Sequence, residues 1–263
     1  MYKIVFSDID GTLLKSDGTV DDKLKTKIQA LVNSGIPFVL ASARSGVGVF
    51  PILKMLDIKA PIIAFSGALI YDKDKNVIKS LEMPKEDAVK IHNYILSQNP
   101  DISVCTYALN LWLCDKKDSW VINEEKAVGL ESVKDSILNY PEISGVHKLL
   151  CMGTKEEIDY IYDCLIKEYG EFDICRSKET YLEVNIKGSS KFFGMKFICD
   201  SMGIDLNDTV AFGDSDVDLE MVNNAGMGYI MENAPDNLKA GAKHIARSND
   251  ESGIYHILKE LDL

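Results

Sequence analysis

A chain of 263 residues with 46% hydrophobic and 27% charged residues is typical of globular proteins, has room for one large core or two smaller ones, and lies outside the disordered class. The net charge of -12, without a dense run of Lys or Arg, excludes nucleic acid as the expected partner. No apolar stretch reaches the roughly 20 residues of a membrane helix and no basic leader precedes an apolar block, so we expect a cytoplasmic protein with no membrane contact.

The first 67 residues alternate between strand and helix patterns. Short apolar segments predict strands, and longer segments with helical periodicity, the first of them ending at Gly35, predict helices between them. This order is typical of βαβ units around a parallel sheet with right-handed crossovers. The predicted elements are a strand at 2–8, a helix at 21–35, a strand at 36–43, a helix at 46–57 and a strand at 61–67.

The middle of the chain has a different pattern. Here consecutive short strands predict an antiparallel sheet with helices on one face. We interpret residues 83–187 as an inserted α+β domain. The predicted elements are helices at 85–98 and 155–170 and strands at 102–109, 111–115, 147–153, 172–177 and 181–186.

The C-terminal third returns to the alternating pattern, with a helix at 190–203, strands at 208–214 and 228–232, and helices at 216–225 and 253–261. Both ends of the chain are therefore expected to build one α/β layer. The predicted fold class is α/β, with a Rossmann-like doubly wound parallel sheet formed by residues 1–82 and 188–263.

Polar residues follow four of the predicted parallel strands. Parallel strands direct their C-terminal ends to a common crevice, so we expect these residues to lie near one ligand. Lys191 opens the helix that precedes the last of the four strands. The polar segments are DIDGT with Asp8 and Asp10, ASAR with Ser42, Ser66 with Gly67, and GDSDVD from Gly213 to Asp218.

Acidic residues dominate this predicted crevice. Asp8 and Asp10, together with the acids of the last segment, would repel one another unless a cation joined them. Oxygen ligands without Cys or His indicate Mg²⁺, which proteins usually hold with one or two carboxylates and a substrate phosphate. Residues i and i+2 of a strand point the same way, so both acids are expected to serve one centre, with Gly11 permitting a tight turn beyond them.

In these residues the chain resembles the haloacid dehalogenase-like phosphatase superfamily, and specifically its Cof-like, class IIB hydrolases. All four signature motifs of that superfamily occur in order. The inserted domain stands between the second and third motifs, where this class carries its cap domain, so the similarity covers nearly the whole chain. The motifs are DxDGT at 8–12, a hydroxyl residue at a strand end as Ser42, a lone Lys at 191, and GDxxxD at 213–218.

The resemblance implies a Mg²⁺-dependent phosphatase in which Asp8 is the nucleophile and forms an aspartyl-phosphate. Asp10 would protonate the leaving alcohol and later deprotonate the attacking water. The carboxylates of Asp8 and Asp214 and the backbone carbonyl of Asp10 would hold the metal, with Asp218 in support.

Phosphate binding would fall to Ser42, Ala43 and Lys191, because a hydroxyl group can donate to phosphoryl oxygens and an ammonium group adds a point charge. The implied partner is a small phosphorylated metabolite, with sugar phosphates as the leading class. The inserted cap would select the leaving group, and the protein is expected as a monomer or small homo-oligomer.

Four positions depart from the family pattern. Ala43 replaces the usual Gly of Thr-Gly-Arg, Ser66 replaces Asn, Phe192 follows the motif lysine where Gly is common, and Val217 replaces Asn before the second acid. These changes spare the nucleophile, acid/base and metal positions. They bear on substrate and rate more than on the class of reaction.

Other interpretations of these residues remain. The first two acids could form a solvated turn, and Asp214, Asp216 and Asp218 could form the acidic first turn of a helix. Arg44 is interpreted as an ion-pair or loop anchor. A phosphometabolite sensor without turnover and a phosphomutase are the alternative functions.

Overall fold

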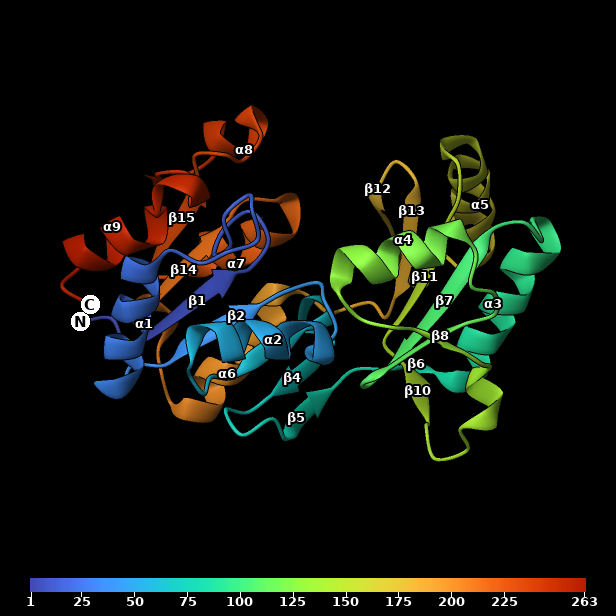
Figure 1. Cartoon of the computed structure of the whole chain (residues 1–263), viewed down its shortest axis with the longest axis horizontal. Helices are drawn as coiled ribbons and strands as arrows, with labels where there is room; N and C mark the ends of the chain where they lie inside the picture. Colours follow the sequence, from blue (N-terminus) through green and yellow to red (C-terminus); the bar gives the residue numbers. More distant parts are fainter. The chain divides into compact units, whose positions relative to one another are not determined.

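The computed structural model describes residues 1–263 and separates into two compact units (Figure 1). The core unit comprises Met1–Ser80 and Ser189–Leu263, and the insert unit comprises Leu81–Gly188. Both units are mixed α/β, with the longer sheet in the core unit. The predicted fold class is confirmed.

The core unit is built on an eight-stranded sheet in the order β16-β15-β14-β1-β2-β3-β4-β5. Its first six strands run parallel, with β1 between β14 and β2, which places β1 at the centre of the sheet. The remaining two pairs, β3 with β4 and β4 with β5, are antiparallel. The strands are β1 (Ile4–Asp8), β2 (Phe38–Ala41), β3 (Ile62–Ala64), β4 (Leu69–Tyr71), β5 (Val77–Ser80), β14 (Thr209–Gly213), β15 (Met227–Met231) and β16 (Ile245–Ala246).

Helices cover both faces of this sheet. Ile4 and Phe6 of β1 point to one face, where they join a buried cluster with Met195 of α6 and Met221 of α7. On the other face α1 packs against α2 and α9. The sheet is therefore doubly wound, as expected. The helices are α1 (Asp22–Asn33), α2 (Gly46–Leu56), α6 (Lys191–Met202), α7 (Leu219–Asn224), α8 (Asp236–Ala240) and α9 (Gly253–Glu260).

The insert unit contains a six-stranded sheet in the order β12-β13-β11-β7-β8-β9, antiparallel except where β8 pairs with β9, and a two-stranded β6–β10 ribbon. One face packs on α3 and α5 through a cluster of aliphatic side chains. Its elements are β6 (Met83–Pro84), α3 (Lys85–Gln98), β7 (Ser103–Ala108), β8 (Leu111–Cys114), α4 (Ser119–Val128), β9 (Val133–Lys134), β10 (Gly145–Val146), β11 (Lys148–Met152), α5 (Lys155–Glu168), β12 (Asp173–Lys178) and β13 (Tyr181–Asn185).

The prediction that all helices of the insert cover one face is wrong for α4, which the sequence patterns did not reveal. Leu182 and Val184 face the cluster under α3 and α5. Side chains alternate along a strand, so Tyr181 points to the other face, where its hydroxyl donates to Glu124 of α4 at 2.7 Å. Helix α4 begins at an ordinary cap, Asp118, whose carboxylate accepts from two backbone amides.

The strand predicted at 61–67 ends at Ala64, and a tight turn follows. Phe65 and Ser66 have φ of +46° and +49°. Their amides donate to the carbonyls of Arg44 and Ser42, both at 2.9 Å, in the loop after β2. This turn joins β3 to the antiparallel β4, which continues into β5, and the alternating pattern predicted neither of these two strands.

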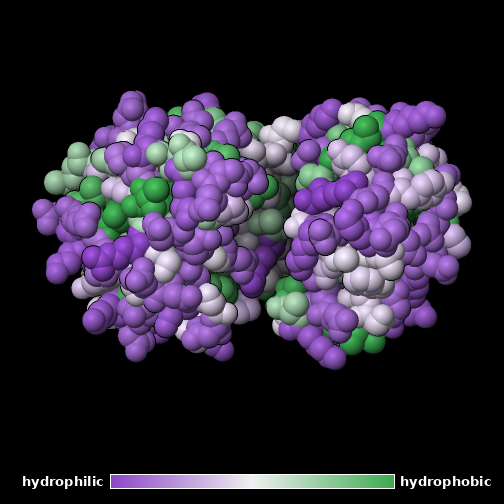
Figure 2. Space-filling view, turned by 90° about the horizontal axis from the view of Figure 1, so that it is seen from above, coloured by the Kyte–Doolittle hydropathy of each residue, from purple (hydrophilic) through white to green (hydrophobic).

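None of the helices combines the length and apolar character needed to cross a membrane. Figure 2 shows a mainly hydrophilic surface on the face in view, with hydrophobic residues in small scattered groups. Such a distribution is ordinary for a globular protein.

Candidate active site

Two neighbouring parallel strands end in carboxylates. Asp8 is the last residue of β1 and is only 6% exposed. Asp214 directly follows β14, which pairs with β1 in register from Ile4 to Ser7. The two side chains therefore share one edge of the core sheet.

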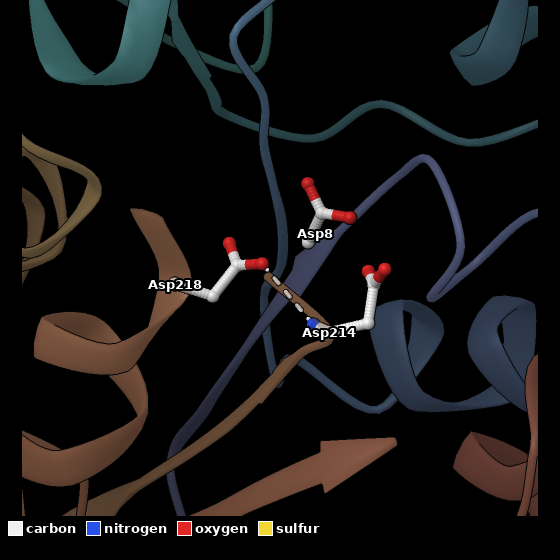
Figure 3. Close-up of side chains that lie close together, drawn as sticks. All are labelled: Asp8, Asp214 and Asp218. Atoms are coloured by element: carbon white, nitrogen blue, oxygen red, sulfur yellow. Dashed lines mark hydrogen bonds between the residues drawn. The ribbon is translucent and has the colours of Figure 1, made fainter. Parts of the chain in front are cut away.

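Asp218 completes a cluster with these two acids, and Figure 3 shows the three side chains turned toward a common space. Asp8, Asp214 and Asp218 each offer one carboxylate oxygen, and these three atoms lie within 4.8 Å of one another. Asp218 lies in the short 3-10 turn Asp216–Asp218 and is fully buried. The cluster brings together three of the four residues expected to hold a metal.

Lys191, at the start of α6, is the cation of this cluster. Its Nζ lies 2.5 Å from Oδ1 of Asp8 and 2.5 Å from Oδ1 of Asp218, and the side chain is 2% exposed. Burial alone would lower the pKa of Lys191, but the charges of both carboxylates raise it above its usual value. The lysine is thus held charged, as a phosphate-binding role requires.

One ammonium group does not balance three carboxylates. Burial raises the pKa of Asp8 well above its usual range against the opposing charge of Lys191, and Asp218 raises it further. Burial also raises the pKa of Asp214. The cluster therefore favours a bound proton or an added cation, and its all-oxygen donor set fits a hard divalent ion such as Mg²⁺.

Backbone and hydroxyl donors hold Asp218 in place. Its Oδ2 accepts from the amides of Asp214 and Ser215 at 3.1 and 3.0 Å, and from Oγ of Ser215 at 2.6 Å. Gly213 is needed here because a Cβ at that position would lie 2.3 Å from Cβ of Asp218. The GDSDVD segment is therefore a self-capped turn that orients one acid.

A threonine of the first motif orients Asp214. Oγ1 of Thr12, 1% exposed, donates to Oδ1 of Asp214 at 2.6 Å. Gly11, with φ of +81°, brings the backbone so close that a Cβ there would lie 2.4 Å from Oδ2 of Asp214. The motif match could have indicated Thr12, but its partner is visible only in the tertiary structure.

Asp10 does not share the environment of Asp8. The strand ends at Asp8, so the expected alternation along a strand does not extend to Asp10, whose side chain is 53% exposed. Its two carboxylate oxygens accept from Nε and Nη2 of Arg44 at 2.8 and 2.5 Å. Arg44 is thus an ion-pair partner, as interpreted, and the residue it anchors is the expected acid/base.

The loop after β2 places Ser42 at the same edge of the sheet. Ser42 is 1% exposed, and its Oγ accepts from the amide of Arg44 at 3.1 Å. Ala43 is exposed. Gly67 packs closely against Ser190, the cap of α6: a Cβ at Gly67 would lie 2.1 Å from the Ser190 carbonyl oxygen. This close approach fixes the start of the helix that carries the lysine.

The remaining departures from the family pattern differ in exposure. Val217 is 53% exposed, whereas Ser66 and Phe192 are partly buried. The neighbouring Asp216 is also exposed. Asp216 takes no part in the acidic cluster.

Comparison with known proteins places this geometry in a family. The family model for haloacid dehalogenase-like hydrolases matches residues 5–258. The chain belongs to the haloacid dehalogenase-like hydrolase family. A Haemophilus influenzae protein, named only provisionally as a phosphatase, is 36% identical to this hydrolase over 263 residues, covering 99% of this chain and 98% of its own.

Two further proteins are similar to this haloacid dehalogenase-like hydrolase along its length. The Bacillus subtilis protein named 5-amino-6-(5-phospho-D-ribitylamino)uracil phosphatase YwtE is 27% identical and covers 98% of both chains. A solved structure described as the subclass IIB sugar phosphatase BT4131 superposes with a TM-score of 0.82 at 21% identity and covers 99% of each chain. At that identity the second likeness establishes the fold alone.

Proposed function

We propose that this hydrolase is a Mg²⁺-dependent phosphatase of small phosphorylated metabolites, with sugar phosphates as the leading class. The observation that carries the proposal is the buried group in which Lys191 bridges Asp8 and Asp218 at 2.5 Å each, beside Asp214. A phosphate dianion needs compensating positive charge and a nucleophile in one place. The phosphatase names of similar proteins, one of them for a ribityl phosphate, support the substrate class.

In the proposed mechanism Asp8 attacks the phosphorus, the bond to the leaving oxygen breaks, and an aspartyl-phosphate forms on the carboxylate. Ser42 and Lys191 bind the phosphoryl oxygens. Asp8, Asp214 and the backbone carbonyl of Asp10 would hold Mg²⁺, with Asp218 in support. Bound Mg²⁺ would supply charge neutralisation for the carboxylates and the phosphoryl group.

Asp10 is proposed as the acid that gives its proton to the leaving alcohol, and then as the base that takes one from water. Its exposure suits a group that must reach the substrate, and Arg44 holds the orientation of its carboxylate. All of these residues belong to the core unit. We therefore propose the core unit as the catalytic domain and the insert unit as a cap domain that selects the leaving group.

Phosphate release from a panel of phosphorylated metabolites, measured with Mg²⁺ and with EDTA, tests the proposal. We expect Asp8→Asn to abolish release and Asp216→Asn to retain it, because Asp216 lies in the same region but outside the cluster. Mg²⁺ should also raise the unfolding temperature of the wild-type protein, and less so that of Asp214→Asn. Robust turnover by Asp8→Asn would refute the role of Asp8 as the nucleophile.

Two outcomes of the same panel would favour the alternative functions. Calorimetric binding of a metabolite without phosphate release would indicate a sensor. An isomerised product in place of free phosphate would indicate a phosphomutase.

A further inference from the structure

The loop that follows the candidate nucleophile is held by two asparagines from the far end of the chain. This loop, residues 9–18, is called the catalytic loop below. Nδ2 of Asn233 donates to the carbonyl of Gly11 at 2.7 Å. Nδ2 of Asn249 donates to the carbonyl of Leu14 at 2.9 Å. More than 200 residues separate each donor from its acceptor.

The two asparagines also bind each other. Oδ1 of Asn233 accepts from the backbone amide of Asn249 at 3.1 Å, so each side of the first amide group is used. Asn249 is 7% exposed, and its acceptor residue Leu14 is 6% exposed. A buried carbonyl without a donor is costly. The Asn249 amide supplies a donor, whereas the isosteric aspartate would have none and would place its charge against the Leu14 carbonyl.

The clamped loop carries Asp10 immediately before Gly11. Arg44 fixes the carboxylate of Asp10, but it does not fix the backbone from which that side chain extends. Gly11 has φ of +81°, in the left-handed region. Because a glycine has no side chain, it has little intrinsic backbone preference at this residue, directly after Asp10. The amides of Leu13 and Leu14 donate to the carbonyl of Ile9 within the loop, and the hydrogen bond from Asn233 adds a restraint on this turn from outside the loop.

We infer that Asn233 and Asn249 are positioning residues for proton transfer by Asp10. The inference rests on the proposed phosphatase function. Neither asparagine belongs to the carboxylate cluster, so their loss should leave the carboxylates of Asp8, Asp214 and Asp218 in place. Proton donation requires hydrogen-bond reach to the leaving oxygen, which a shift of about 1 Å in the loop would disturb.

Substrates with different leaving groups separate this role from a general structural one. An alkyl phosphate releases a poor leaving group that needs a proton from Asp10, whereas p-nitrophenyl phosphate releases a stabilised phenolate that needs little protonation. A mispositioned acid should therefore slow the first substrate more than the second. A general loss of structure should slow both equally.

The experiment compares kcat/KM for glycerol phosphate and p-nitrophenyl phosphate in Asn233→Ala, Asn249→Ala and the full-length wild type. We expect a loss of about 10- to 100-fold for glycerol phosphate and less than about threefold for p-nitrophenyl phosphate. Asp10→Asn, which removes the acid, shows the largest selective loss for glycerol phosphate that mispositioning could cause. The matched control is Asp250→Ala, which removes the bonds to Ser16 at the exposed end of the same loop and should change neither value.

Equal losses for both substrates, or no loss for either, would overturn the inference. Asn233 is exposed, so its variant should fold even if the buried Asn249 variant does not. If Asp8→Asn retains turnover, the proposed function fails. If Asp8→Asn is inactive and Asp10→Asn shows the selective loss while both asparagine variants do not, the positioning role alone fails.

Discussion

Gly11 and Gly18 lie in one loop and have nearly the same φ, +81° and +80°, but they lie in different surroundings. A Cβ added at Gly11 would lie 2.4 Å from Oδ2 and 2.9 Å from Cγ of Asp214, whereas a Cβ at Gly18 would meet nothing within 4 Å. Gly11→Ala therefore combines backbone strain with a displaced carboxylate. Gly18→Ala imposes the backbone strain alone.

The two effects have different magnitudes. A left-handed alanine costs roughly 1–2 kcal/mol, so each variant should lose about 2–4 °C of unfolding temperature per kcal/mol. To restore an ordinary contact, the Asp214 carboxylate must move by about 1 Å, away from Thr12 and from its place beside Asp8. A displacement of about 1 Å in a reacting group costs about 100-fold in rate.

We therefore expect Gly11→Ala to lower kcat/KM about 100-fold and to weaken Mg²⁺ binding, while Gly18→Ala retains wild-type kinetics. Thermal unfolding, isothermal titration with Mg²⁺ and steady-state phosphate release on the two variants measure these effects. Equal kinetics for the two variants would refute the reasoning, because a Cβ clashes with Asp214 at Gly11 and meets no neighbour at Gly18.

Three further predictions concern charge and exposure. Lys191→Met should destabilise the protein by about 3–5 kcal/mol, because it leaves two buried carboxylates uncompensated. Mg²⁺ should therefore raise the unfolding temperature of this variant more than that of the wild type. An equal rise in both proteins would contradict the prediction. Burial lowers the pKa of His147 to about 4 against the charge of Glu82. The free energy of unfolding should therefore be independent of His147 above about pH 6.5 and should decrease by up to about 3 kcal/mol as the pH falls toward 4. Urea unfolding at several pH values measures this decrease, which His147→Gln should remove. Val217→Asn adds a hydrogen-bond donor on an exposed side chain and should raise kcat/KM about tenfold at saturating Mg²⁺. A fall in kcat/KM would show that the valine side chain itself contributes to activity.

The alternation of strands and helices that builds the parallel part of the core sheet could be predicted from the sequence. Apolar segments of strand length alternate with helical periodicity, and a parallel sheet requires such crossovers. Asp8 and Asp214 come at the ends of two such strands, so their shared edge of the sheet follows from the pattern. The strand ends and Asp10 were less predictable, because hydrogen bonds from distant loops decide where a strand stops.

Tertiary structure alone decided the partners of the site residues. Lys191 and Arg44 are unremarkable in sequence, since a cation's role depends on which carboxylates lie within hydrogen-bond reach. Helix α4 has a local cap in Asp118, but it was missed because the face that packs on the sheet became recognisable only in the folded chain. Local periodicity and motif order are written in neighbouring residues, whereas bonds such as that from Asn233 to Gly11 join residues that only the folded chain brings together.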